Sequence, residues 1–157
     1  MFFEHKMLYT TKFNDVPEVE EDVCIPFGRA RIVAEGADIT VVTNSMMTIK
    51  AEKAVRQLQK EGISAELIDL RTIVPWTPRQ SSVGEKDGQA ADRRRGPPQL
   101  RHHRRDRSRI MPDVFYDLDA PIQRMGTADV PLPFSPALEF PLIPDEKKIA
   151  AKIREMV

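Results

Sequence analysis

The residues of this chain that could take part in chemistry are concentrated in one basic stretch. Eight of the fifteen arginines lie between Arg93 and Arg109, together with two of the three histidines, His102 and His103. Arginines at this density can bind phosphate groups. The stretch has no aromatic residues that could stack on bases, it matches no helix-turn-helix or zinc-finger pattern, and its histidines lack partner ligands at zinc spacing. These observations weigh against nucleic-acid binding. A non-enzymatic protein that binds nucleic acid or a partner is kept as the alternative function, because the arginines alone could bind phosphate.

Other kinds of site have no support in the sequence. There is no glycine-rich phosphate loop of the G-x-G-x-x-G or G-K-[ST] type. The single cysteine, Cys24, can form neither an internal disulfide nor a thiolate metal cluster. No apolar run approaches the roughly 18 residues that a membrane span needs. We therefore expect a soluble intracellular protein with no metal-ligating residue of its own.

The neutral net charge of the chain hides an uneven distribution of charged residues. Lysine plus arginine is 24 and aspartate plus glutamate is 24. Residues 84–109 contain nine basic and four acidic residues, so this stretch carries +5 and the rest of the chain −5. Its apolar side chains are only Ala90, Ala91 and Leu100, too few to offset the entropy lost on ordering. The sequence predicts a disordered or irregular basic insert at about 82–109, between ordered parts at 1–80 and 110–157.

The first ordered part has the pattern of a strand, a helix and a second strand. Residues 38–44 (D-I-T-V-V-T-N) are β-branched and mostly apolar, as in a short buried strand. One helical stripe follows, with apolar residues at the spacing i, i+3, i+4, i+7: Ala51, Ala54, Val55 and Leu58. Gly62 fits the position just past a helix end, and residues 64–70 (S-A-E-L-I-D-L) resemble another strand. This βαβ unit predicts an α/β fold with a sheet dominated by parallel strands.

The second ordered part contains a proline-rich arm. Residues 120–126 (A-P-I-Q-R-M-G) fit another short strand. Residues 129–144 hold five prolines, which predict an extended, irregular arm. A ligand for a proline-binding domain is one interpretation of it. The preferred one is an arm laid over its own protein or over a subunit, because it carries large apolar side chains that favour burial, at Leu132, Phe134, Leu138 and Phe140.

A final helix is predicted after the arm. Asp145 follows Pro144 and is a residue type that caps helix N-termini. Apolar residues then fall on one face of the predicted helix, at Ile149, Ala150, Ile153 and Val157.

Several of these segments together resemble a known family. They are F-F-E-H-K-M-L-Y, I-P-F-G-R-A, D-I-T-V-V-T, K-E-G-I-S-A-E-L-I-D-L-R-T-I-V-P-W and D-A-P-I-Q-R-M-G-T-A-D-V-P-L-P-F-S-P-A-L-E. In this order they resemble the beta subunit of a 2-oxo acid dehydrogenase decarboxylase component, of the pyruvate and acetoin type. The match covers about 1–80 and 110–157. The resemblance implies a three-layer transketolase C-terminal-like domain at 16–157, aberrant at 82–109. Residues 1–15 would be a remnant of the preceding pyrimidine-binding domain, with Phe2 to Tyr9 as its last strand.

The resemblance also implies what the parent enzyme does. Family members use thiamine diphosphate and magnesium, assemble as α2β2 tetramers, decarboxylate a 2-oxo acid oxidatively and acylate the lipoyl groups of an acyltransferase core. The glutamate that promotes ylid formation lies in the pyrimidine-binding domain, and no residue here matches it. We therefore expect this chain to bind no cofactor alone, to be inactive alone, and to supply an assembly and docking domain.

Partners and compartment follow from the same resemblance. The expected partners are the alpha subunit, a second beta subunit and the dihydrolipoyl acyltransferase core, with no membrane and no nucleic acid. The compartment would be the bacterial cytoplasm, or the mitochondrial matrix in a eukaryote. The final helix is the expected docking element for the acyltransferase, through Lys147, Lys148, Ile153, Arg154 and Val157.

Residues 82–109 depart from the family pattern, which has a strand, an acidic turn and a helix there. When the codons are shifted by one base, synonymous choices exist in which Ala90 to Arg95 become L-L-I-V-D-E, a buried strand and its turn. We therefore expect two compensating frame changes, one near Ser81–Ser82 and one near Arg107–Arg109, in place of a natural basic loop. Since burying unpaired charge costs several kcal/mol, the sequence predicts that this segment stays out of the sheet, with poor folding cooperativity and aggregation.

Overall fold

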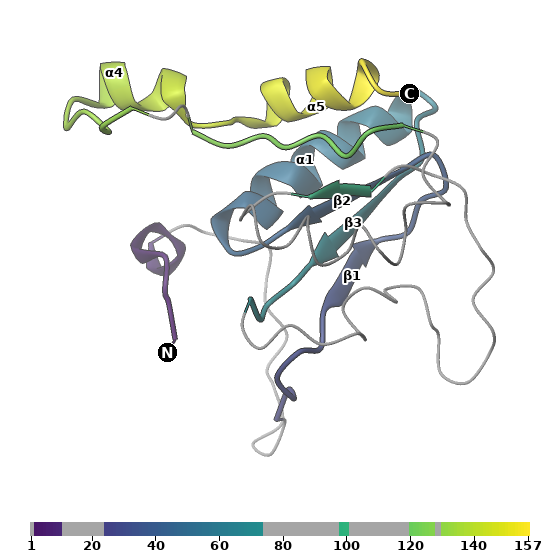
Figure 1. Cartoon of the computed structure of the whole chain (residues 1–157), viewed down its shortest axis with the longest axis horizontal. Coiled ribbons are helices and arrows are strands. Elements are labelled where there is room, and N and C mark those ends of the chain that lie inside the picture. Colours follow the sequence, from purple (N-terminus) through teal and green to yellow (C-terminus); the bar gives the residue numbers. More distant parts are fainter. Residues whose placement is uncertain (1, 11–23, 74–97, 101–119, 128–129) are drawn as a thin grey trace.

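The computed structural model describes residues 2–10, 24–73, 98–100, 120–127 and 130–157. In this part of the chain one mixed sheet is covered on one face by two helices (Figure 1). The strands are β1 (Arg31–Ala34), β2 (Ile39–Thr43), β3 (Ala65–Asp69) and β4 (Pro98–Leu100). Their order in the sheet is β1-β3-β2-β4. β2 is parallel to β3 and to β4, and β1 is antiparallel to β3, which confirms an α/β fold dominated by parallel pairs.

The βαβ unit is confirmed at the predicted place. Helix α1 (Met46–Lys60) connects β2 to β3, and all four residues of the predicted apolar stripe are buried. Gly62 adopts φ +90° directly after the helix. The amide of Gly62 donates to the Gln59 carbonyl at 3.2 Å, and the amide of Ile63 donates to the Leu58 carbonyl at 3.0 Å. These two bonds are a Schellman motif, which ends the helix at a residue where glycine carries no Cβ penalty.

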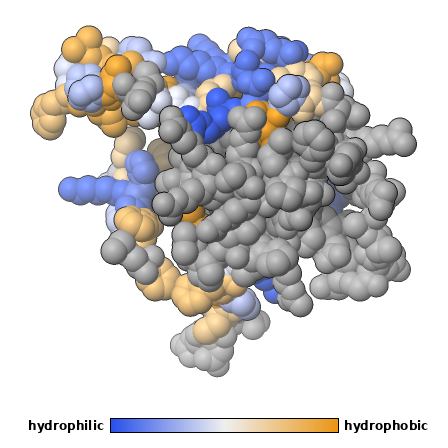
Figure 2. All heavy atoms as spheres, in the orientation of Figure 1, coloured by the Kyte–Doolittle hydropathy of each residue, from blue (hydrophilic) through white to orange (hydrophobic). Residues whose placement is uncertain are grey.

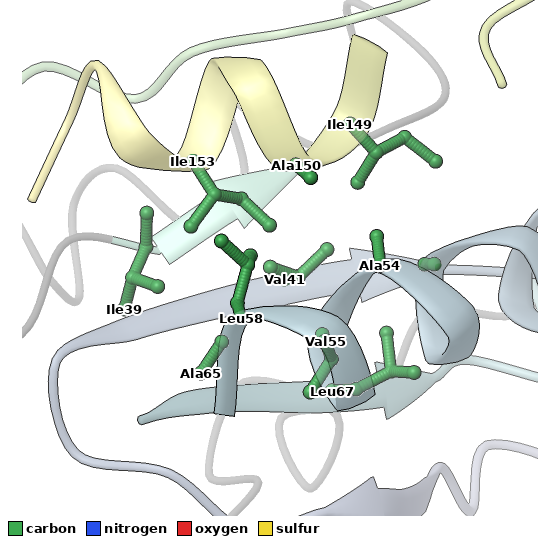
Figure 3. Close-up of a cluster of buried hydrophobic side chains, with 11 residues drawn as sticks. Ile39, Val41, Ala54, Val55, Leu58, Ala65, Leu67, Ile149, Ala150 and Ile153 are labelled. Atoms are coloured by element: carbon green, nitrogen blue, oxygen red, sulfur yellow. The ribbon is translucent and has the colours of Figure 1, made fainter. Parts of the chain in front are cut away.

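The hydrophobic core lies between the sheet and both helices. Helix α5 (Glu146–Arg154) lies along α1, and its inner side chains point toward α1 and the sheet (Figure 3). Among them, Ile149 and Ile153 are each 3% exposed. The opposite side of β2 and β3 is also buried, at Val42 and Ile68. Successive residues of a strand face opposite sides of the sheet. Burial of side chains on both faces of β2 and β3 therefore fits an inner sheet of a three-layer fold.

Asp145 caps α5 as predicted, and this cap gives a stability prediction. Its Oδ1 accepts a hydrogen bond from the Lys148 amide at 2.7 Å, which lowers the pKa of Asp145. Asp145→Ala is expected to lower the free energy of unfolding by about 1 kcal/mol at neutral pH, measured by urea denaturation. A carboxylate with a lowered folded-state pKa stabilises above its unfolded pKa, and this contribution disappears as pH falls through the folded value. Asp145→Asn, which keeps a cap, should retain stability in acid; equal loss in both variants would contradict the cap.

Four expectations about elements are wrong. Residues 120–127 form no strand, and the start of the chain forms a 3-10 helix, η1 (Lys6–Tyr9), instead of a strand. The proline-rich arm is not extended throughout: Pro136 begins the short helix α4 (Pro136–Glu139), which continues into η3 (Phe140–Leu142). Proline is well suited to the first helical turn because its missing N–H has no partner there. Val157 lies beyond the end of α5 and is 60% exposed.

The expectation that residues 82–109 stay out of the sheet is wrong in one place. Pro98, Gln99 and Leu100 pair in parallel with Thr40, Val41 and Val42 of β2. None of these three β4 residues is charged, so pairing them buries no charge, and Pro98 is the first strand residue, a position where a missing N–H is tolerated. Two other expectations concern residues outside the described ranges. One is that the arginine run Arg93–Arg95 stays out of the sheet, and the other is the domain boundary between residues 15 and 16.

Candidate functional site

A polar cluster lies where β2 and β3 end. The hydroxyl of Thr43 is fully buried and lies 3.1 Å from the hydroxyl of Thr48 and 3.3 Å from the Ile68 carbonyl. Asp69, the register partner of Thr43, accepts hydrogen bonds from Thr48 and from the Arg71 amide. In open α/β sheets, ligands bind beyond the carboxyl ends of the parallel strands. This cluster is therefore the place in the sheet where a ligand would be sought.

The backbone around this cluster has two unusual conformations. Ser45, two residues after β2, has φ 51°, and Arg71, two residues after β3, has φ 55°. Neither is glycine, and non-glycine residues with positive φ are uncommon. Their hydrogen bonds explain the geometry: Ser45 precedes α1 and its carbonyl accepts from the Thr48 amide at 3.0 Å, and the Arg71 amide is held by the Asp69 carboxylate at 3.3 Å. The cluster is satisfied internally.

Burial sets the ionisation of Asp69. Desolvation is the largest influence and raises the pKa of this carboxyl, while the Arg71 amide, the Arg71 and Arg31 charges and the Thr48 hydroxyl act in the opposite direction. A raised folded-state pKa means that the native state holds its proton more tightly than the unfolded chain does. Stability is then highest at a pH below the unfolded value and falls as pH rises through the folded-state pKa.

The direction of this pKa shift can be tested with variants of Asp69. Asp69→Asn removes the ionisation but keeps an acceptor for Thr48 and for the Arg71 amide. We expect it to raise the melting temperature at neutral pH, with a gain that shrinks as the pH is lowered below the ordinary pKa of aspartate. Asp69→Ala, which leaves the Thr48 hydroxyl without this acceptor, should lower it. An asparagine variant less stable than wild type throughout the pH series would show that the carboxylate bonds outweigh desolvation.

The described residues were compared with what the magnesium ion of thiamine diphosphate requires. A magnesium diphosphate needs oxygen ligands around the metal. Within the described ranges no three histidine, cysteine, aspartate or glutamate side chains come together to hold a metal ion. We therefore assign no step of a thiamine-dependent reaction to any described residue.

The five predicted docking residues on the last helix have different environments. Ile153 is 3% exposed and lies in the core, so its side chain is not available on the surface. Lys148 Nζ donates to the Pro141 carbonyl and lies 3.5 Å from the Ile143 carbonyl. Lys147 and Val157 are exposed. The helix periodicity already predicted that Ile153 lies on the buried face of the last helix. That prediction alone would have excluded Ile153 from the expected docking residues.

Arg154 is held by an ion pair that joins the two helices. Its Nε and one terminal nitrogen contact the two carboxylate oxygens of Glu61 at 2.8 and 2.7 Å. This two-point contact lowers the pKa of Glu61 and raises that of Arg154. Both side chains are more than a third exposed, so the pair orients the end of α5 against the end of α1 and contributes little to stability in water.

Among the described residues, most of the exposed large apolar side chains belong to two groups. One group combines side chains at the start of the described chain with Phe27. The ring centroids of Phe2 and Phe27 lie 5.9 Å apart. The other is the arm from Val130 to Phe140, which forms an apolar projection at the upper left of the molecule (Figure 2). Phe134 is completely exposed. The predicted burial of the arm's apolar residues is thus not achieved within this single chain, and sequence pattern could not have shown whether one chain would suffice.

Known proteins resemble the chain over most of its length. The family model described as "Transketolase, C-terminal domain" matches residues 28–149. The 2-oxoisovalerate dehydrogenase subunit beta of Bacillus subtilis is 33% identical over 99% of this chain and 48% of its own length. Pyruvate dehydrogenase E1 component subunit beta-1, mitochondrial, of Arabidopsis thaliana is 35% identical over 95% of this chain and 42% of its own. The beta subunit of acetoin:2,6-dichlorophenolindophenol oxidoreductase of Cupriavidus necator is 36% identical over 99% of this chain and 45% of its own length.

A solved structure supports the fold. A protein titled "Split gene transketolase, inactive beta4 tetramer" matches with a TM-score of 0.62 and 23% identity, over 90% of this chain and 45% of that one. The chain thus spans about half the length of the curated relatives it matches. Within the described residues no helix is long and apolar enough to cross a membrane.

Proposed function

Since the chain belongs to the transketolase C-terminal domain family, we propose that it is the assembly and docking portion of a beta subunit of a 2-oxo acid dehydrogenase of the pyruvate type. The parent complex would use thiamine diphosphate and magnesium to decarboxylate a 2-oxo acid oxidatively and to transfer the acyl group to lipoyl groups. The supporting observation is the family match at 28–149 together with relatives named as dehydrogenase beta subunits over 95–99% of this chain.

The proposal assigns catalysis to parts of the parent enzyme outside this chain. The matched relatives are about twice as long, and the described polar cluster at the sheet edge is satisfied by its own hydrogen bonds. A fragment of this kind is inactive alone. Its partners are the alpha subunit, a second beta subunit and the dihydrolipoyl acyltransferase core, in the bacterial cytoplasm or the mitochondrial matrix.

Docking to the acyltransferase core is assigned to the exposed part of the last helix and its end. Lys147 supplies an exposed positive charge and Val157 an exposed apolar side chain. Lys148 and Arg154 support this face indirectly, because their contacts to Pro141 and Glu61 fix the orientation of α5. A charged rim beside an apolar contact is a common arrangement at protein interfaces.

The basic segment is part of the same proposal. We assign residues 82–109 to two compensating frame changes, because the shifted codons can spell a buried strand where the family has one. The coding DNA tests this directly: the expected shifted frame contains no stop codon and spells L-L-I-V-D-E at the codons of Ala90 to Arg95. A stop codon there, or a polar sequence, would leave a natural basic loop. The nucleic-acid alternative depends on arginines outside the described residues and has no further support.

A domain exchange tests the assembly function. In the Bacillus subtilis relative, the carboxyl-terminal part matched by this chain is replaced by residues 24–157, and the product is purified with its alpha subunit. We expect a stable complex when residues 83–106 are also replaced by their shifted-frame sequence, and a weaker one with the present sequence. Failure of both versions to co-purify with the alpha subunit, while the unmodified relative does, would contradict the proposal.

A further inference from the structure

Methionine side chains border the core that holds the last helix. Among the described residues, six partly buried apolar side chains pack against the buried cluster between α1, α5 and the sheet, and three of these six are Met47, Met125 and Met156. Methionine accounts for only 7 of the 157 residues of the chain. The three come from separate places: the first turn of α1, the segment 120–127 and the turn after α5. These three side chains are named the methionine rim.

The thioether sulfur of methionine can be oxidised, unlike the aliphatic side chains of this cluster. Its lone pair attacks one oxygen of a peroxide, so that a sulfur–oxygen bond forms and the oxygen–oxygen bond breaks. The sulfur loses two electrons to the peroxide, whose other oxygen takes up the released proton and leaves as water or an alcohol. The sulfoxide is polar, and a polar group loses free energy when it is buried without a hydrogen bond. Because the rim is only partly buried, dissolved peroxide can reach it.

Helix α5 depends on this core more than α1 does. It has 9 residues, fewer than the roughly 12–15 that an isolated helix needs in water. Its position is therefore set by the side chains that it buries in the cluster, at Ile149, Ala150 and Ile153. The ion pair between Arg154 and Glu61 is exposed and adds little. By contrast, α1 has 15 residues and is joined at both ends to strands of the sheet. Elements with few independent contacts open first, so α5 is the helix that a weakened core would release.

From these observations we propose that the methionine rim is an oxidation site for hydrogen peroxide and organic peroxides, at which sulfoxide formation releases α5 from α1. Release uncovers Ile149 and Ile153 of α5 and Leu58 of α1, which are at most 3% exposed in the reduced chain. Oxidation therefore exposes an apolar surface that reduction covers again. Methionine also fills irregular gaps in cores, but leucine would serve that purpose equally well, so the two roles of the rim differ only after oxidation. The inference concerns packing within this chain and does not depend on the proposed function.

Hydrogen exchange before and after oxidation tests the inference on the full chain. All proteins carry Cys24→Ser, because the exposed thiol of Cys24 also reacts with peroxide. The protein is treated with hydrogen peroxide, the excess is removed with catalase, and sulfoxides are located by peptide mass spectrometry. We expect sulfoxides at all three rim positions and an exchange of the α5 amides that is about five- to thirtyfold faster, with a smaller change in β2 and β3. Methionine sulfoxide reductases A and B together should restore slow exchange, since each reduces one sulfoxide epimer.

Two variants separate the rim from other methionines. The rim variant carries Met47→Leu, Met125→Leu and Met156→Leu, which nearly conserve side-chain volume, and its α5 exchange should be the same with and without peroxide. Met7→Leu removes a thioether of η1 that is 54% exposed and should leave the peroxide effect intact.

Three results would overturn the inference. The rim methionines could stay reduced while Met7 is oxidised, rim sulfoxides could form without faster exchange in α5, or the oxidised rim variant could exchange as fast as the oxidised parent protein. If the rim variant does not fold, the reductases decide: sulfoxides repaired at the rim without a return of slow α5 exchange would also overturn it.

Discussion

Replacing Ile153 with alanine is expected to lower the free energy of unfolding by about 2–5 kcal/mol. Ile153 is 3% exposed and belongs to the cluster that joins α5 to α1 and the sheet. Figure 3 shows its side chain pointing toward Leu58 of α1 and Ile39 of β2. Truncation removes three buried carbon atoms and leaves a cavity that neighbouring side chains fill only partly. Urea denaturation of purified protein measures the loss.

Val157→Ala is the matched control for this variant. Both residues are apolar, lie four positions apart and were predicted on the same face of the last helix, but Val157 is 60% exposed. Its truncation should change stability by less than about 0.5 kcal/mol. Equal losses in the two variants, or a stable Ile153→Ala protein, would show that α5 does not pack on α1 as described.

Gly36→Ala is expected to cost about 1–3 kcal/mol, the usual range for overpacking. A Cβ at Gly36 would lie 2.2 Å from the backbone carbon of Ala65 and 2.2 Å from the backbone nitrogen of Glu66. Backbone atoms at the start of β3 cannot rotate away. The neighbouring turn is also tied to that strand, because the amides of Ala37 and Asp38 donate to the Ser64 carbonyl at 3.0 and 2.9 Å. The added methyl group must therefore push apart β3 and the chain that enters β2.

The control for this prediction is Gly126→Ala. No heavy atom lies within 4 Å of a Cβ built on Gly126, and its backbone φ is outside the left-handed region. Its thermal melting temperature should be unchanged or slightly higher, because alanine restricts the unfolded chain. If Gly36→Ala melts at the same temperature as Gly126→Ala, the close approach at Ala65 is incorrect.

The sequence was sufficient to predict the part of the fold that depends on local periodicity. The apolar stripe from Ala51 to Leu58, the positive φ of Gly62 and the Asp145 cap are each specified within a few residues. The buried face of α5 follows from the same rule, since Ile149 and Ile153 lie on one helix face. Such features depend on short-range geometry, which the residue types determine.

Features that depend on partners distant in the sequence were not predictable in the same way. Pairing of Pro98–Leu100 with β2 joins segments more than fifty residues apart, and no pattern in three residues specifies that register. The exposure of Phe134 and Phe140 depends on which molecule covers the arm. Among the expected docking residues, Ile153 was misplaced because its apolar character fits both a core and an interface.

Titration with thiamine diphosphate distinguishes an assembly domain from a cofactor-binding one. We propose that this chain supplies assembly surfaces and that the cofactor contacts belong to other parts of the parent enzyme. Isothermal titration of thiamine diphosphate with magnesium into the chain should give no saturable heat, while the full-length Bacillus subtilis relative with its alpha subunit serves as the positive control. Saturable binding by this chain alone, with an affinity close to that of the control, would contradict the account.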